Sequence, residues 1–250
     1  MEKQQTDYKC PLCQDTGWLV DERGAYRCPC QNEAELNRRR QRARLTPALL
    51  AMRFENFDVS LYPSQMKEIV KGQEKKIGAR TAAKKAVNAA SDFVRAIVNG
   101  KSARGLIFEG KVGRGKTFLA ASICNALVEK QVECLFLVVP EFLEELRYSY
   151  QADSLYNEAE LMRQAENVPV LFLDDLGAHS YSEWTKNKIF TILNYRLNHR
   201  LPCIITTNLD VDEMSEAIGE RSVSRIMEMC DYHFLFRGAD IRRKQKGENE

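Results

Sequence analysis

The chain has 250 residues, of which 44% are hydrophobic and 29% are charged, and its formal net charge is +2. This length suits one α/β domain of about 200 residues with a small appendage. The near-neutral charge excludes nucleic-acid binding through bulk charge alone. The first residues, MEKQQTDYK, are polar, and no apolar run approaches the roughly 20 residues that span a bilayer. We therefore expect a cytoplasmic protein without a membrane partner.

Four of the eight cysteines lie within residues 1–32, as Cys10-Pro-Leu-Cys13 and Cys28-Pro-Cys30. In a reducing compartment, clustered thiols indicate a metal site more often than disulfides. Four thiolates in a tetrahedral arrangement suit structural Zn²⁺. Because the second pair is C-x-C rather than C-x-x-C, free or redox-active thiols stay open as an alternative. We predict a zinc-binding module over residues 1–32, with the metal contributing its folding free energy.

Two segments rich in helix formers and basic residues follow the module. Residues 33–45 predict a helix that ends near Thr46-Pro47, within a connecting helix and linker over 33–60. Residues 62–99 predict a second helical region, with Gly72 and Gly78 as weak points. For the arginine cluster of residues 38–44 and the lysine-rich stretch 67–85, a solvated helix face is the favoured interpretation.

After Gly100, short apolar runs alternate with longer amphipathic stretches, which is typical of an α/β fold with a parallel sheet and crossover helices. We expect five strands, at residues 105–109, 134–138, 168–173, 203–206 and 232–236. Together with their helices they predict a doubly wound core. We assign this domain to residues 61–244 and expect residues 245–250 to be a disordered tail.

The segment from Gly110 to Thr117 fits the phosphate-loop pattern G-x-x-x-x-G-K-[ST] between an expected strand and an expected helix. Its glycines allow the backbone to turn N–H groups toward a polyphosphate. Lys116 is predicted to bind the β and γ phosphates of ATP, and Thr117 to ligate Mg²⁺. The predicted nucleotide-binding residues are Gly110, Lys111, Val112, Gly113, Arg114, Gly115, Lys116, Thr117 and Asp174.

Polar residues at later strand ends complete a predicted hydrolytic site. Asp174 and Asp175 follow an apolar strand, at the sheet edge where ligands bind. We expect Asp174 to hold Mg²⁺ through its water shell and Asp175 to polarise the attacking water. Asn208, one strand later, is placed to hydrogen-bond the γ-phosphate and that water. Helix capping is the alternative for each of these three residues.

Arg221 and Arg225 are four residues apart and so share one face of an expected helix. Arginine suits the stabilisation of charge on a transferring phosphoryl group, often from a neighbouring subunit. Surface salt bridging is the alternative.

From Phe54 to the carboxyl terminus, the chain resembles the helicase-loader branch of the AAA+ ATPases, the DnaC and DnaI type that includes the IstB transposition helpers. The residues that carry the resemblance are FENFD, GKVGRGKT, VLFLDDLG, TTNLD, ERSVSRI and FRGADIRRK. It implies an AAA+ core without a large lid, a sensor role for Asn208, and a trans-acting arginine finger at Arg225, with Arg221 as second candidate. Asp175 stands where most AAA+ proteins have a glutamate, which implies slow, switch-like hydrolysis.

The resemblance implies a DNA replication protein that loads a hexameric replicative helicase, binds single-stranded DNA and self-associates through its ATPase domain. Two alternatives stay open. One is an IstB-like transposition accessory ATPase, although such helpers usually lack an amino-terminal cysteine module. The other is a zinc-dependent DNA or protein adaptor in which nucleotide only sets the conformation. The expected cofactors are ATP, Mg²⁺ and Zn²⁺.

Overall fold

The structure is a computed structural model, and it describes residues 8–70, 73–149, 157–178 and 181–236. The predicted disordered tail, 245–250, lies outside the described residues. Within these ranges, no helix combines the length and the apolar character needed to cross a membrane.

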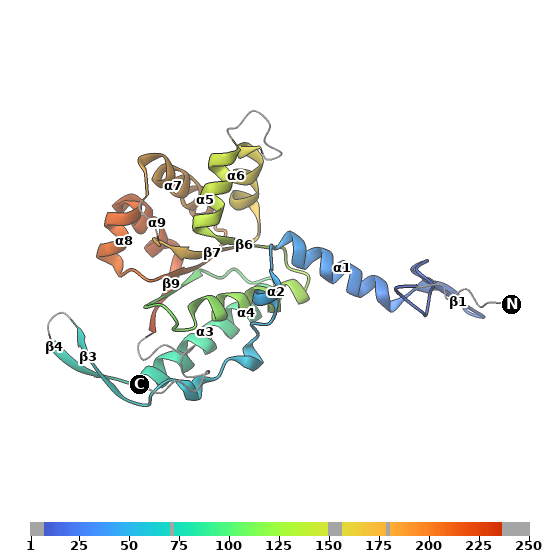
Figure 1. The fold of residues 1–250 in the computed structure, drawn as a ribbon, viewed down its shortest axis with the longest axis horizontal. Helices are drawn as coiled ribbons and strands as arrows, with labels where there is room; N and C mark the ends of the chain where they lie inside the picture. The colour runs from blue at the N-terminus through green and yellow to red at the C-terminus, as the bar shows by residue number, and fades with distance from the viewer. Residues whose placement is uncertain (1–7, 71–72, 150–156, 179–180, 237–250) are drawn as a thin grey trace.

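A five-stranded parallel sheet forms the centre of the molecule, as predicted, with the strand order β6-β7-β8-β5-β9 (Figure 1). The strands are β5 (Gly105–Gly110), β6 (Cys134–Val138), β7 (Val170–Leu176), β8 (Cys203–Thr207) and β9 (Cys230–Phe236). β7 begins two residues later than expected, because Val168 caps the preceding helix and Pro169 lacks a backbone N–H. The phosphate-loop strand β5 therefore lies between two others.

Helices cover both faces of the sheet. One face carries α3 (Ala79–Val98) and α4 (Lys116–Glu129), and the other carries α5 (Val139–Tyr148), α6 (Glu158–Asn167), α7 (Glu183–Asn198), α8 (Val211–Ile218) and α9 (Glu220–Met229). Successive strand side chains point to opposite faces. Accordingly, Leu106 and Phe108 belong to the α3/α4 core, and Ile107 belongs to the other.

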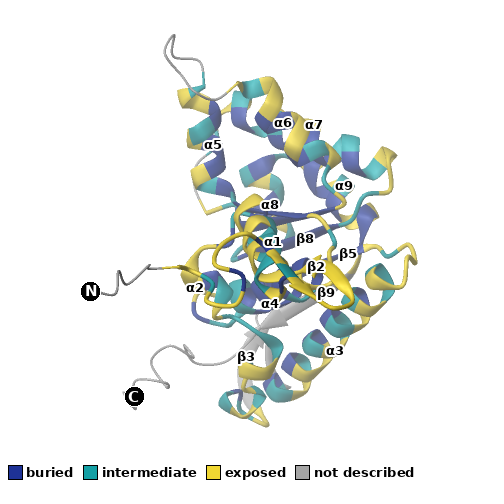
Figure 2. Ribbon diagram, turned by 90° about the vertical axis from the view of Figure 1, so that its right-hand side faces the viewer, coloured by how far each residue is buried: buried dark blue, intermediate teal, exposed yellow. Residues whose placement is uncertain are grey.

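The amino-terminal region projects from this body. A short hairpin of β1 (Trp18–Asp21) and β2 (Gly24–Arg27) leads into α1 (Pro29–Arg42), which extends away from the sheet. In Figure 2, β2 is exposed, whereas the helix faces that turn toward the sheet are buried. α1 begins four residues earlier than expected, since Pro29 is tolerated in the first helical turn.

The predicted linker packs on the core after α1 ends. Phe136 of the edge strand β6 donates its N–H to the carbonyl of Ala43 at 3.0 Å. Leu45 and Leu49 are buried in the α3/α4 core. The short elements here are α2 (Pro47–Leu50) and the 3-10 turns η1 (Phe54–Asn56) and η2 (Val59–Leu61).

The predicted helical region over 62–99 is wrong in its first half. Residues 66–77 contain an antiparallel hairpin, β3 (Met66–Val70) and β4 (Gln73–Ile77), and the helix α3 starts only at Ala79. β-Branched residues at 69, 70 and 77 and glycines at 72 and 78 favour strands and a turn over a helix. In α3, the lysines at 84 and 85 are exposed, which confirms the solvated-face interpretation for that part.

Candidate nucleotide site and four-cysteine cluster

The phosphate loop has the predicted order of strand, loop and helix. β5 ends at Gly110, and α4 begins at Lys116. Gly110, Gly113 and Gly115 have φ values of 148°, 75° and 81°, a region that L side chains rarely adopt. The loop's backbone conformation therefore depends on glycine at these positions.

Lys116 and Asn208 come together behind this loop. The Lys116 side chain is 5% exposed, and its Nζ donates to the carbonyls of Gly110 and Lys111 at 2.7 and 3.0 Å. Nζ also donates to Asn208 Oδ1, 2.5 Å away, at the end of the neighbouring strand β8. An ammonium group and an amide thus face one point beyond the carboxyl ends of β5 and β8, which is a suitable arrangement for anionic phosphates.

Thr117 and Asp174 form a second pair at the same sheet edge. The Thr117 hydroxyl lies 3.0 and 3.1 Å from the two carboxylate oxygens of Asp174, and the Thr206 hydroxyl donates to Asp174 at 2.7 Å. Burial raises the pKa of Asp174, although both hydroxyls favour its ionised form. A hydroxyl and a carboxylate side by side fit the oxygen ligands that Mg²⁺ prefers.

Asp175 faces a different environment from Asp174. The register between β7 and β8 shifts between Leu173 and Leu176, and Asp175 has a positive φ of 58°. Its backbone N–H donates to Thr206 Oγ1 at 3.0 Å, and the residue lines the cavity beside the phosphate loop. The irregular strand end therefore brings two successive carboxylates to one site, whereas a regular strand would send them to opposite faces.

A cavity of about 490 Å³ adjoins the loop. Its predicted lining residues are 112–117, Asp175 and Asn208. Its unpredicted lining residues are Ala48, Ala51, Met52 and Phe118. The first three lie before the core in a stretch without a motif, so sequence patterns offer no signal for them.

Two aromatic residues cover the loop from outside. Tyr62 donates its hydroxyl to the carbonyl of Arg114 at 2.7 Å, and its ring stacks on Phe57 at 5.9 Å between centroids. A Cβ at Gly115 would lie 2.8 Å from the Tyr62 hydroxyl and 3.1 Å from Phe57. Phe57 belongs to the FENFD stretch that the family resemblance singled out, but the sequence did not indicate its contact with the loop.

Arg221 and Arg225 both lie on α9, as predicted, and neither lines the cavity just described. The guanidinium of Arg221 lies over the ring of Phe190, 4.3 Å from its centroid. Arg225 reaches Glu228 at 3.5 Å, and its buried Nε has no hydrogen-bond partner among the described residues. Neither arginine is placed to act on a nucleotide in its own subunit's cavity.

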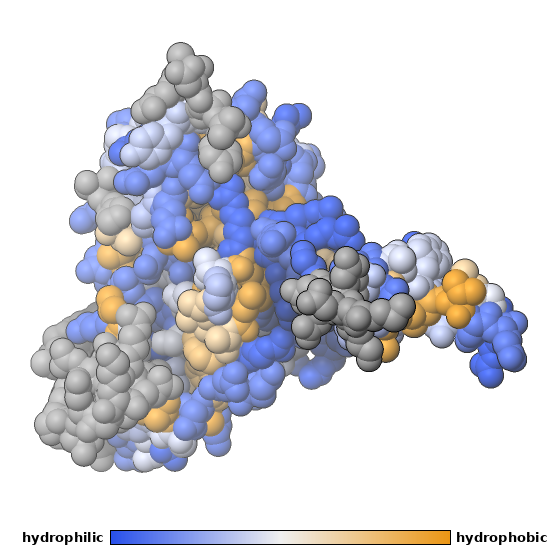
Figure 3. Space-filling model, turned by 45° about the vertical axis from the view of Figure 1, so that its right-hand side comes forward, coloured by the Kyte–Doolittle hydropathy of each residue, from blue (hydrophilic) through white to orange (hydrophobic). Residues whose placement is uncertain are grey.

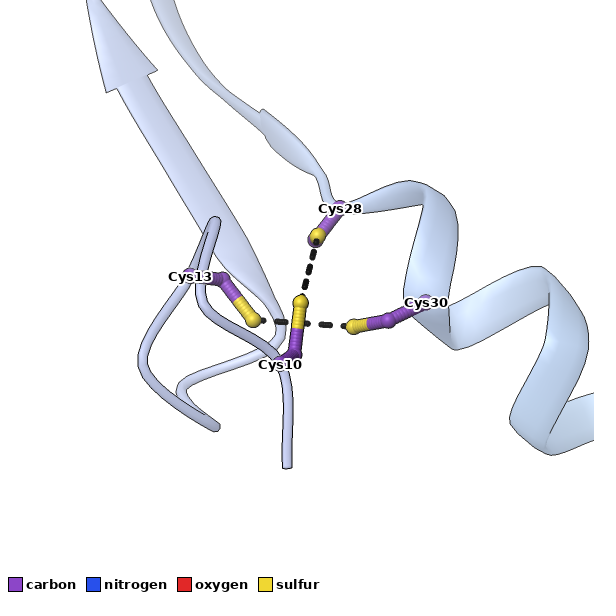
Figure 4. A group of neighbouring side chains, drawn as sticks. All are labelled: Cys10, Cys13, Cys28 and Cys30. Atoms are coloured by element: carbon purple, nitrogen blue, oxygen red, sulfur yellow. Dashed lines mark hydrogen bonds between the residues drawn. The ribbon is translucent and has the colours of Figure 1, made fainter. Parts of the chain in front are cut away.

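The four clustered cysteines converge at the root of α1 (Figure 4). The sulfur atoms of Cys10 and Cys28 are 3.7 Å apart, those of Cys13 and Cys30 are 3.5 Å apart, and all four lie within 4.8 Å of one another. Zinc–sulfur bonds of about 2.3 Å in a tetrahedron place sulfurs about 3.8 Å apart. The arrangement therefore fits one tetrahedral Zn²⁺.

Local hydrogen bonds surround these thiols and shift two of their pKa values in opposite directions. Asp15 accepts from the N–H of Cys10 at 2.8 Å, and Gly17 donates its N–H to the Cys13 sulfur at 3.3 Å. A backbone N–H of Cys13 lowers the pKa of Cys10 to about 7. A hydrogen bond with Cys28 raises the pKa of Cys30 above its ordinary value. The lowered pKa favours the thiolate form of Cys10, and a bound cation would favour the thiolate form of the other three cysteines.

The other four cysteines lie apart from this cluster, as predicted. Cys124, Cys134, Cys203 and Cys230 are buried in helix and strand positions of the core. Among the described residues, the only group of cysteine, histidine and acidic side chains close enough to share a metal is the amino-terminal one.

Comparison with known proteins identifies the core. The model of the family described as IstB-like ATP binding protein matches residues 79–246, more than half of the chain. The replicative helicase loader DnaI of Bacillus subtilis (strain 168) is 36% identical over 50% of this chain and 39% of its own length. The replicative helicase loader DnaC of Escherichia coli (strain K12) is 32% identical over 48% of this chain and 49% of its own. The chain thus spans less than half the length of these two relatives.

Solved structures agree with the sequence matches. A crystal structure of DnaI superimposes with a TM-score of 0.61 at 27% identity, covering 81% of this chain and 100% of that one. The sheet order, the phosphate loop and the likeness to crystal structures of DnaI and of the DnaC helicase loader show an AAA+ P-loop core. No large lid is present among the residues that the structure describes. The chain therefore belongs to the family of IstB-like ATP-binding proteins.

Proposed function

We propose that this protein is an ATP-dependent loader of a replicative helicase, in which MgATP acts as an assembly switch on single-stranded DNA. The observation that carries the proposal is the joint placement of Lys116, Asn208 and the Thr117–Asp174 pair at one sheet edge, in a chain homologous to helicase loaders. A four-cysteine module on a projecting helix adds a second, separate surface to this ATPase core.

Each residue of the site then has a distinct role. Lys116 binds the β and γ phosphates, while Thr117 and Asp174 hold Mg²⁺, which neutralises phosphate charge when bound. Asp175, which lines the cavity, orients and polarises the attacking water, and Asn208 positions it against the γ-phosphate. An aspartate in this position reaches less far than a glutamate, which supports slow, switch-like turnover.

The arginines of α9 act in trans. Because neither Arg221 nor Arg225 lines the cavity of its own chain, a contribution to phosphoryl transfer requires a neighbouring subunit. Arg225 is the stronger candidate, since the Arg221 guanidinium is already engaged with the ring of Phe190. Hydrolysis would therefore depend on self-association through the ATPase domain.

The cysteine module suits a protein partner better than DNA. It exposes five large hydrophobic side chains, visible in part as hydrophobic surface on the projecting region in Figure 3: Tyr8, Leu12, Trp18, Val20 and Tyr26. Between residues 8 and 28 its three basic side chains are matched by three acidic ones. Exposed apolar side chains on a module whose charged side chains balance favour a protein interface over a phosphate backbone. We assign the helicase to this surface and single-stranded DNA to the assembled ATPase domains.

A mixing experiment with the host's own replicative helicase tests the proposal. Lys116→Ala should abolish productive ATP binding, because it removes the ammonium group behind the phosphate loop. Arg225→Ala should bind ATP nearly as well as wild type and turn it over at least about a hundredfold more slowly. A mixture of the two variants should recover turnover, since some interfaces pair an intact loop with an intact arginine.

Turnover and transfer of the helicase onto circular single-stranded DNA are both measured. The matched controls are Lys130→Ala and Arg163→Ala. Lys130 lies at the other end of α4 from Lys116, and Arg163 forms an ion pair with Glu160 at the same three-residue spacing as the pair of Arg225 and Glu228. Inactive mixtures of variants that still assemble would exclude the trans role. Absence of helicase transfer by wild type would refute the loader function, and stimulation by a transposase instead would support the transposition alternative.

A further inference from the structure

The nucleotide cavity has two chemically different ends. At one end lie the charged and polar groups around Lys116, Thr117 and Asp175. At the other, Ala48, Ala51 and Met52 form an apolar wall, here called the α2 wall. The wall precedes residue 79, where the match to the family model begins. An apolar surface in the same cavity as a phosphate site suits the base of a nucleotide.

One side chain holds the α2 wall in place. Asn125 is 3% exposed on α4, and its Nδ2 donates to the carbonyls of Leu49 and Met52, each at 2.8 Å. α2 has only four residues and would not keep its conformation alone. Both donors of the Asn125 amide group are therefore used to attach the wall to α4.

The same helix carries the phosphate ligands. α4 begins with Lys116 and Thr117, and Asn125 lies eight residues beyond Thr117, or about 12 Å along the helix axis. A rigid helix thus sets the separation between the phosphate end of the cavity and the α2 wall.

The neighbours of Asn125 on α4 are apolar. Ile123, Cys124 and Leu127 on α4 are fully buried, and a polar amide among them is costly unless it is hydrogen-bonded. By contrast, the buried Ser122 donates to Phe118 of its own helix at 2.8 Å. The amide of Asn125 instead bonds to the segment that lines the cavity.

We propose that Asn125 is a positioning residue that holds the α2 wall against the nucleotide base, so that the site favours a nucleoside triphosphate over a bare triphosphate. The proposal rests on the assignment of the cavity as the ATP site. It concerns only the contacts of the base, and the roles proposed for the residues that bind the phosphates stay the same.

The test compares two probes, MgATP and magnesium tripolyphosphate, which lacks the base. Asn125→Asp is nearly isosteric and removes both N–H donors. Its affinity for MgATP should fall roughly tenfold, because the α2 wall loses both side-chain hydrogen bonds that attach it to α4, while its affinity for tripolyphosphate should stay the same. Calorimetry provides both dissociation constants, and a general loss of fold would weaken both probes together.

Ser122→Ala, three residues away on α4, is the matched control and should leave both affinities unchanged. Ala51→Leu obstructs the wall while keeping the amide, and so tests the wall even if Asn125→Asp does not fold. Equal weakening of both probes by a folded Asn125→Asp or Ala51→Leu variant, or unchanged affinity of both variants for MgATP, would overturn the proposal. Wild type that binds neither probe would instead refute the ATP site itself.

Discussion

The cysteine module and the ATPase core differ in what lies inside them. Between residues 8 and 28 the buried residues are Cys13, Gly17 and Cys28, and Val20 is 79% exposed. The core buries two layers of aliphatic and aromatic side chains, one on each face of the sheet. The core can therefore fold through apolar burial, whereas a unit as small as the module needs a metal.

The largest expected effect is the loss of zinc from the module. Purified protein should carry about one zinc per chain, and the Cys10→Ser, Cys28→Ser double variant should carry none. Structural zinc contributes on the order of 10 kcal/mol to small domains, so the module should unfold while the core stays folded. Elemental analysis and hydrogen exchange over residues 8–42 and over β5 measure these outcomes.

The matched control is Cys134→Ser in β6, which should keep its zinc. Loss of zinc from this control, or zinc retained by the double variant, would contradict the assignment of the four ligands. Unfolding of the core together with the module would show that the core does not fold independently of the metal.

A substitution at a buried arginine should destabilise the core and leave zinc bound to the module. Arg196 on α7 is fully buried and donates to five backbone carbonyls, those of Ala165, Glu166, Val168, Pro169 and Pro202, at 2.8 to 3.4 Å. Arg196→Met keeps an unbranched apolar stem and removes the guanidinium group that donates to these carbonyls. The free energy of unfolding should fall by about 3 kcal/mol, which lowers Tm by roughly 6 to 12 °C.

Thermal unfolding measures this change, and zinc content should stay at one per chain. The exposed Arg163→Met on the neighbouring helix α6 is the control, with an expected change within about 0.5 kcal/mol. A Tm for Arg196→Met equal to that of the control would show that the carbonyls find other partners.

The smallest effect on stability is expected at the module's surface. Val20→Ser should change the free energy of unfolding by less than about 0.5 kcal/mol and leave zinc bound, because the side chain is already in water. Its affinity for the helicase should nevertheless fall if the apolar face is the docking surface. Glu22→Ser in the adjacent turn is the control. Equal helicase binding by both variants would show that the interface does not include Val20.

Much of the core and site followed from local patterns. Short apolar runs between amphipathic stretches predicted all five strands, although β7 and β9 each begin two residues away from the expected start. The phosphate loop, the paired aspartates and Asn208 were predicted at strand ends that the fold brings together. The hairpin at 66–77 was mistaken for helix, since lysine-rich stretches with scattered apolar residues fit either period. Its glycines and β-branched residues were the stronger signals.

The sequence by itself determined the chemistry of this protein: which residues carry charge, hydroxyl, thiol and amide groups, and in which order strands, loop and helices follow. Only the tertiary structure decided which distant segments complete the nucleotide cavity. Met52 and Tyr62 have no motif of their own. Asn125 bonds to Met52, which lines the cavity, and Tyr62 bonds to Arg114 of the phosphate loop, each across more than fifty residues of chain. Such contacts depend on packing between elements, which no local pattern records.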